Sequence, residues 1–220
     1  MDSRDANILL VGHSFIRRFK NFMVPQFYNK DIVCGMHDHA AGQFAVNLRI
    51  DTHYQKIYTF SHGLTSINQL PWALESIRQT NPIVTVIDIG SNDLANLTTY
   101  DPNQCLILAT ATFNFAESLT QQGISVILHG IIPRRGRIDC SYEVFLDNST
   151  YYNKVLKLLC EDASQIHFHK LRGFHNPMDI HCSSLPWSLD NIHCNSPSGR
   201  RKYQAQLRHG LLLHHFHITN

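Results

Sequence analysis

A serine, an aspartate and a histidine in this chain have the types and spacing that nucleophilic catalysis requires. Ser14 follows an apolar run and Gly12-His13, and late in the chain stands Asp190-Asn-Ile-His193. A serine hydroxyl becomes a good nucleophile only when a base within about 3 Å takes its proton, and histidine titrates in the right range. An aspartate bonded to the other ring nitrogen fixes the tautomer and stabilises the imidazolium. On a turn, the spacing of Asp190 and His193 lets the two side chains meet while the ring still projects toward Ser14.

Such chemistry also needs hydrogen-bond donors for the oxyanion that forms when a carbonyl is attacked. Three candidates are the backbone N–H groups of Ser14 and Gly63 and the side-chain amide of Asn92. The loss of one such donor typically costs about 3 kcal/mol of transition-state stabilisation. Glycine suits position 63 because it lets a substrate approach the backbone closely.

Apolar periodicity predicts the strands and helices that must position these groups. Five strands are expected, at residues 8–11, 56–60, 83–89, 124–128 and 166–168. Helices are expected at residues 15–22, 67–77, 102–122, 151–160 and 197 to about 214. The stretch 83–89 is apolar on both faces, which is typical of a central parallel strand.

The remaining stretches are less regular. Residues 31–35 predict one more short strand, whereas His37-Asp38-His39 and Gly42 are typical of a loop, and residues 170–196 are irregular. Because strands and helices alternate with short connections, we expect an α/β protein: a single domain over residues 1–220 with one parallel sheet in a three-layer α/β/α sandwich.

The strand order decides whether the chemical groups meet. Parallel strands all end at one edge, so the turns that carry Ser14, Gly63 and Asn92 share that edge. We expect the flavodoxin-like order 2-1-3-4-5, which opens a crevice between the first and third strands. Ser14 and Asn92 would then face each other across the crevice, with Gly63 on the flank.

At these residues the sequence resembles the SGNH hydrolases, a superfamily of GDSL-like serine esterases and lipases. The matching blocks are Gly12-His13-Ser14, Ser61-His62-Gly63-Leu64, Gly90-Ser91-Asn92-Asp93 and Asp190 to His193, with Asn195 and Gly199 beyond. The resemblance implies that Ser14 is the nucleophile, that His193 is the base and that Asp190 orients His193. It also implies that Ser14, Gly63 and Asn92 form the oxyanion hole. It also implies an enzyme that cleaves carboxylic esters through an acyl-enzyme, without a cofactor or metal. We expect a small ester substrate, an acylated lipid, sugar or other alcohol, with a short acyl group such as acetyl.

The sequence departs from this family at one position, because His13 replaces the aspartate that usually precedes the nucleophile. The family's local hydrogen bonding therefore does not carry over to this corner. Gly-His-Ser-Phe-Ile-Arg-Arg at residues 12–18, with a tail rich in His and Cys, also looks like esterase-type domains encoded by retrotransposons. That likeness implies a domain of a larger mobile-element protein.

Composition argues against several classes of protein, including nucleic-acid binders, membrane-spanning proteins and disulfide-rich proteins. The net charge of +2 over 220 residues gives no sign of a nucleic-acid binder, and no segment approaches the roughly 20 apolar residues of a membrane span. The six cysteines show no CxxC pair, which indicates reduced thiols, and we expect an intracellular, cytoplasmic protein. His167 and His169 share one strand face, yet no further ligand stands at a zinc spacing, so we expect no metal.

Each motif also has a purely structural interpretation. Ser14 could be only a helix cap, Asn92-Asp93 an Asx turn, and Asp190 with His193 a surface ion pair. The alternative function is then an inactive binding module on the same fold, associated with nucleic acid through Arg200-Arg201-Lys202 in a transposon-derived protein.

Overall fold

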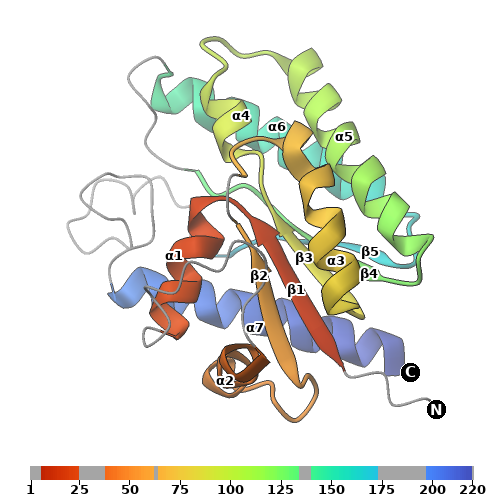
Figure 1. Cartoon of the computed structure of the whole chain (residues 1–220). Helices are drawn as coiled ribbons and strands as arrows, with labels where there is room; N and C mark the ends of the chain where they lie inside the picture. The colour runs from red at the N-terminus through yellow and green to blue at the C-terminus, as the bar shows by residue number, and fades with distance from the viewer. Residues whose placement is uncertain (1–5, 25–37, 62–63, 134–139, 173–196, 220) are drawn as a thin grey trace.

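The chain folds into a five-stranded parallel sheet with helices on both faces. The computed structural model describes residues 6–24, 38–61, 64–133, 140–172 and 197–219 (Figure 1). The strands are β1 Asn7–Gly12, β2 Lys56–Phe60, β3 Val84–Asp88, β4 Ser125–His129 and β5 Ile166–His169. The α-helices are α1 Ser14–Met23, α2 Asp38–Leu48, α3 Leu74–Thr80, α4 Ser91–Ala95, α5 Pro102–Thr120, α6 Tyr142–Cys160 and α7 Pro197–Thr219. A 3₁₀ helix, η2, spans Ile67–Ala73.

The strand order β2-β1-β3-β4-β5 confirms the predicted fold class and topology. Every neighbouring pair is parallel, and β1 lies between β2 and β3. The second strand of the chain, β2, therefore lies on one side of β1, whereas β3, β4 and β5 lie on the other side. In such sheets the crevice opens beyond the carboxyl ends of the strands at this reversal.

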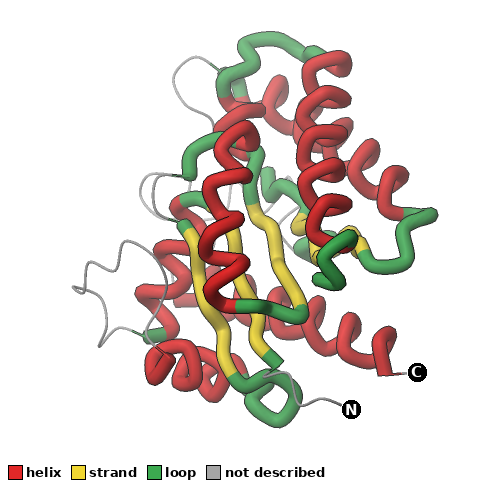
Figure 2. The backbone as a smooth tube through the Cα atoms, turned by 45° about the vertical axis from the view of Figure 1, so that its right-hand side comes forward, coloured by secondary structure: helices red, strands yellow, loops and turns green. Residues whose placement is uncertain are grey.

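Two layers of helices cover the sheet. Helices α1, α2 and α7 lie on one face, and α3, α4, α5 and α6 lie on the other (Figures 1 and 2). Side chains attach helix α7 to its neighbours: the hydroxyl of Tyr54, just before β2, donates to the Leu211 carbonyl at 3.1 Å, and the ring of Phe19 in α1 packs against that of Tyr203 with centroids 5.0 Å apart.

The burial of the central strands follows from their sequence. Every residue of β1 and of β3 is buried, because helices cover both faces of these apolar segments. One member of β3 is a carboxylate, Asp88, which lies at the carboxyl end of the strand. A charged residue inside an otherwise apolar strand needs compensating partners.

One predicted loop is wrong. Asp38, His39 and Gly42 lie within helix α2, whose buried side chains are Ala40, Ala41, Phe44, Ala45 and Leu48. Their spacing fits one face of a helix, but the polar and glycine residues between them hide the pattern in the sequence. His37 and the strand predicted at residues 31–35 lie outside the described residues.

Three predicted helices have different limits in the structure. Helix α6 begins at Tyr142 rather than at residue 151, because Ser141 caps it by accepting from Val144 N at 3.2 Å. The predicted helix 67–77 begins as 3₁₀, with Pro71 inside it, and becomes α-helical only at Leu74. Helix α7 continues to Thr219, beyond the expected end near residue 214. No helix in the described part of the chain is long and apolar enough to cross a membrane.

We predict that Gly12→Ala destabilises the fold. Gly12 pairs with Asp88 across β1 and β3, and a Cβ there would collide with the Asp88 carbonyl oxygen and come within 2.6 Å of Ile16 Cγ1. Overpacking of this kind costs about 3 kcal/mol at its usual upper end. Urea unfolding measures the loss of unfolding free energy.

Gly42→Ala is the matched control. Gly42 lies inside α2, and the nearest atom to a Cβ there is 4.0 Å away. This substitution should raise the unfolding free energy by up to about 1 kcal/mol. Equal effects of the two substitutions would contradict the close approach at Gly12.

Candidate functional site

The serine predicted as nucleophile lies at the corner between the central strand and the first helix. Strand β1 ends at Gly12, His13 is the N-cap residue of α1, and Ser14 is the first residue of that helix. Backbone N–H groups in a first helical turn have no acceptor within the helix. Ser14 is partly exposed, and it lies at the carboxyl end of β1, next to β3.

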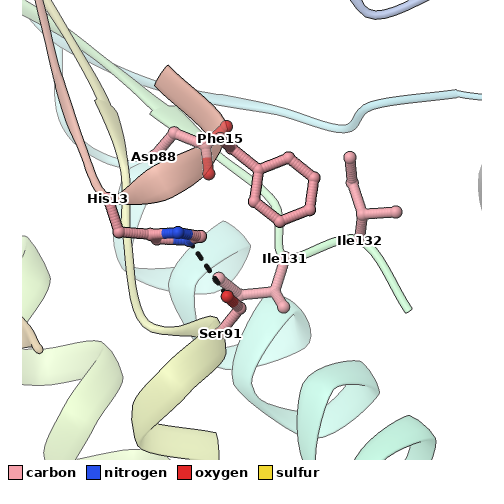
Figure 3. A pocket seen from close by; sticks show the side chains of 6 residues that line it. All are labelled: His13, Phe15, Asp88, Ser91, Ile131 and Ile132. Atoms are coloured by element: carbon pink, nitrogen blue, oxygen red, sulfur yellow. Dashed lines mark hydrogen bonds between the residues drawn. The ribbon is translucent and has the colours of Figure 1, made fainter. Parts of the chain in front are cut away.

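A chain of hydrogen bonds joins this corner to the turn after β3. His13 Nδ1 lies 3.3 Å from Ser14 Oγ, and His13 Nε2 lies 3.0 Å from Ser91 Oγ, as the dashed line in Figure 3 shows for the second contact. Ser91 is the first residue of α4, immediately before Asn92. The turns that carry Ser14 and Asn92 are therefore linked directly through the imidazole of His13.

The His13 ring is held in one orientation. Its residue is 2% exposed, and the Phe15 ring packs edge-on against it with centroids 5.2 Å apart. Ser91, at 4% exposed, is also buried. A pocket beside this hydrogen-bond chain is lined by His13, Phe15, Asp88, Ser91, Ile131 and Ile132 (Figure 3).

Asp88 is a buried carboxylate at the end of β3. Its Oδ2 accepts a hydrogen bond from the Tyr203 hydroxyl of α7 and lies 3.5 Å from His129 Nδ1 of β4. Burial alone would raise the pKa of Asp88. The hydrogen bond and charge of His129, the charge of His13 and the Tyr203 hydroxyl outweigh burial, so the pKa lies below its ordinary value.

Asn92 and Asp93 tie the turn after β3 to the segment after β2. The Asn92 amide donates to the Thr65 carbonyl at 2.9 Å, and the Asp93 carboxylate accepts from Ile67 N at 3.2 and 3.3 Å. Burial raises the pKa of Asp93 to about 6. Thr65 follows Gly63 by two positions in the sequence, so Asn92 contacts the segment next to the glycine predicted for the oxyanion hole.

Of the predicted site residues, the structure describes two. Ser14 and Asn92 lie in neighbouring turns at the carboxyl edge of the sheet. Gly63, Asp190 and His193 lie outside the described residues, so their roles stay predictions.

Sequence reasoning did not assign Asp88, Ser91 or Tyr203 to the site. Of these three, Asp88 left a signal, since it is the acidic residue inside the strongest apolar strand.

A row of histidines continues from Asp88 toward the edge of the sheet. His129 of β4 pairs in register with His169 of β5, and their ring centroids are 5.7 Å apart. His209 of α7 follows, with its ring 5.9 Å from that of His169. Burial first, and then the charges of His129, His209 and Arg172, lower the pKa of His169 to about 4. Among the described residues, no three His, Cys, Asp or Glu side chains are arranged to hold a metal ion.

Only the comparison of three-dimensional structures relates this chain to known proteins, and it supports the fold. No family model and no curated protein matches the sequence. Solved structures do match it. A GDSL-like lipase from Bacteroides thetaiotaomicron is 17% identical, with 96% of this chain and 90% of that chain covered and a TM-score of 0.61. The chain has the fold of a GDSL-like lipase.

Two acetyl xylan esterases share this fold. AlAXEase is 18% identical, with 91% of this chain and 97% of that chain covered and a TM-score of 0.62. The acetylxylan esterase Axe2 from Geobacillus stearothermophilus is 14% identical, with 94% of each chain covered and a TM-score of 0.61. At these identities the likeness establishes the architecture, and the chemistry depends on the side chains at the site.

We predict that the unfolding free energy falls in mild acid through His169. The folded protein holds the pKa of this ring near 4, below its ordinary 6.5, so the unfolded chain binds more protons between these pH values. The part of the unfolding free energy that depends on a neutral His169 is fully present above about pH 6.5 and is lost as the pH falls toward 4. One proton gives a slope of at most about 1.4 kcal/mol per pH unit, less at a half-buried ring that water screens.

Urea unfolding of wild type and His169→Gln between pH 4.5 and 7.5 measures this slope. The substitution should flatten it. The control is His209→Gln, which removes the exposed ring next to His169 and should leave most of the pH dependence in place. An unchanged slope in His169→Gln would contradict the assignment.

Proposed function

We propose that this protein is a serine hydrolase that cleaves carboxylic esters, with Ser14 as the nucleophile. One observation carries the proposal: the Ser14 hydroxyl lies at the corner of β1 and α1, where this topology opens its crevice. The same fold occurs in a GDSL-like lipase and in acetyl xylan esterases, which supports ester chemistry. By that analogy the substrate is a small ester with a short acyl group such as acetyl.

The reaction follows from the proposed roles of Ser14, His193 and Asp190. Ser14 Oγ attacks the ester carbonyl carbon while its proton passes to His193, and Asp190 stabilises the imidazolium. The tetrahedral intermediate collapses, the ester C–O bond breaks, and the alcohol leaves with the proton from His193. Water then attacks the acyl-Ser14 ester, gives its proton to His193, and releases the carboxylic acid as that proton returns to Ser14 Oγ. This chemistry requires no metal or cofactor.

The oxyanion of this intermediate needs donors at the carboxyl edge of the sheet. We assign the backbone N–H groups of Ser14 and Gly63 and the Asn92 amide to this role. The hydrogen bond from Asn92 to the Thr65 carbonyl supports the assignment, because it fixes the amide beside the segment that follows β2. An Asn amide carries two N–H groups, so it can serve a carbonyl and an oxyanion together.

The anchoring of α7 supports His193 as the base. Helix α7 begins at Pro197, shortly after His193 in the sequence. Its Tyr203 hydroxyl donates to Asp88, whose strand neighbour in β1 is Gly12. The segment that carries Asp190 and His193 therefore leads into a helix that is bound at the edge of the sheet where Ser14 lies.

We predict that Ser14→Ala abolishes ester turnover. With p-nitrophenyl acetate, kcat/KM should fall at least about 10³-fold, because no other group replaces the nucleophile. Ser149→Ala is the matched control: this buried serine of α6 donates to the Leu146 carbonyl and should leave turnover unchanged. Equal activity of wild type and Ser14→Ala would overturn the proposal. Absence of turnover together with salt-sensitive RNA or DNA binding would favour the inactive binding module.

A second prediction concerns pH. If His193 is the base, its protonated form cannot take the Ser14 proton, so kcat/KM should fall as the pH drops through an apparent pKa of about 6 to 7. Initial rates between pH 5 and 8, on protein shown to be folded at each pH, measure the profile. A flat profile would exclude His193 as base.

A further inference from the structure

The residue before the nucleophile carries a different hydrogen-bonding group from the one that the resembled family uses. An ionised aspartate at this position only accepts hydrogen bonds, whereas a neutral imidazole both donates and accepts. Here His13 stands at this position, with Nδ1 3.3 Å from Ser14 Oγ and Nε2 3.0 Å from Ser91 Oγ. The histidine therefore allows a hydrogen bond to the Ser14 oxygen that an aspartate cannot donate.

We propose that His13 is a positioning residue for Ser14: it donates from Nδ1 to Ser14 Oγ, while the hydrogen bond between its Nε2 and the Ser91 hydroxyl holds the ring in place. This inference rests on the proposed function, and it adds a residue that orients the nucleophile. The Ser14 oxygen then accepts one hydrogen bond, keeps a second lone pair for the carbonyl carbon, and directs its own proton to the base.

The surroundings of His13 suit such a role. The ring is buried, the Phe15 edge packs against it, and both ring nitrogens lie close to hydroxyl oxygens (Figure 3). Burial and these contacts restrict rotation of the ring and so keep Nδ1 near Ser14, and Ser91 is the buried first residue of α4. The Ser14 hydroxyl is thereby aligned through His13 from the start of α4, rather than by its own helix alone.

The opposite tautomer would make His13 itself the proton acceptor. Ser14 would then donate to Nδ1, and Nε2–H would donate to Ser91. A base needs an imidazolium that is stabilised through its other nitrogen, and a carboxylate does this better than a hydroxyl. In the proposed function His193 with Asp190 fills that role, so the Ser14 proton passes to another residue and the Ser14 oxygen accepts from His13.

Two substitutions at position 13 separate these possibilities. His13→Asn keeps an N–H donor close to the place of Nδ1 but cannot take up a proton. His13→Leu keeps the size of the side chain and removes both polar atoms. We expect kcat for p-nitrophenyl acetate to stay within about fivefold in His13→Asn and to fall about 10- to 100-fold in His13→Leu, with KM unchanged in both.

Ser91→Ala tests the hydrogen bond between Ser91 and His13 Nε2. Without the Ser91 hydroxyl the His13 ring loses the hydrogen bond at Nε2 and is held less firmly, so kcat should fall about 10-fold with KM unchanged, whereas Ser149→Ala should have no effect. Circular dichroism and urea unfolding confirm that each variant is folded. If His13→Asn is as inactive as His13→Leu, or if all variants match wild type, or if only KM changes, the inference is overturned.

A measurement independent of turnover keeps the inference separate from the proposed function. ¹⁵N NMR of the imidazole rings in the full chain, with the His13 signals assigned by their loss in His13→Asn, reports which nitrogen carries the proton. We expect a proton on Nδ1 of His13 in wild type, and a shifted Nε2 signal in Ser91→Ala, which removes the hydrogen-bond partner of Nε2. An Nε2–H form in wild type would overturn the inference. Loss of Ser14-dependent turnover with the Nδ1–H form present would overturn the proposed function alone.

Discussion

A buried negative charge, that of Asp88, organises the carboxyl edge of the sheet. Removing a carboxylate from water is costly unless it is paired and hydrogen-bonded. The His129 imidazole and the Tyr203 hydroxyl meet this need, and together with the charge of His13 they lower the pKa of Asp88 despite its burial. These partners come from α7 and β4, so one side chain fastens the last helix and a neighbouring strand to the end of β3.

The same edge brings β1 and β3 unusually close together. Gly12 has no side chain, which lets the Asp88 carbonyl approach the end of β1. The turns that follow these strands are then near enough for His13 to reach Ser91 and for the pocket of Figure 3 to form between them. The position of Ser14 thus depends on a close packing of backbones and on a polar network beneath it, rather than on the local helix alone.

Low identity to lipases and esterases of the same fold is compatible with this arrangement. The fold requires apolar strands, amphipathic helices and a close approach at the corner, and many sequences supply these. The polar groups around the corner are less constrained by the fold. The proposed pairing of His13 with Ser91 gives this chain its own way of orienting a serine at a corner that the fold already provides.

The sequence by itself determined the sheet and the region of the site. Five apolar segments separated by helical patterns allow few parallel arrangements, so strand order and the shared edge of Ser14 and Asn92 were predictable. Apolar periodicity missed the first turns of α6 because polar residues are buried there. Asn148, for example, is buried since it accepts a hydrogen bond from Asp101 N and donates one to the Thr99 carbonyl.

What only the tertiary structure decided is the network of Asp88, Tyr203, His13 and Ser91. Its members come from segments far apart in the chain, and each has a type that is common in turns, caps or helices, so their meeting leaves no local pattern. Hydrogen bonds between such residues depend on distances of a few tenths of an ångström. Those distances arise only when β1, β3 and α7 pack together, and a linear sequence does not contain them.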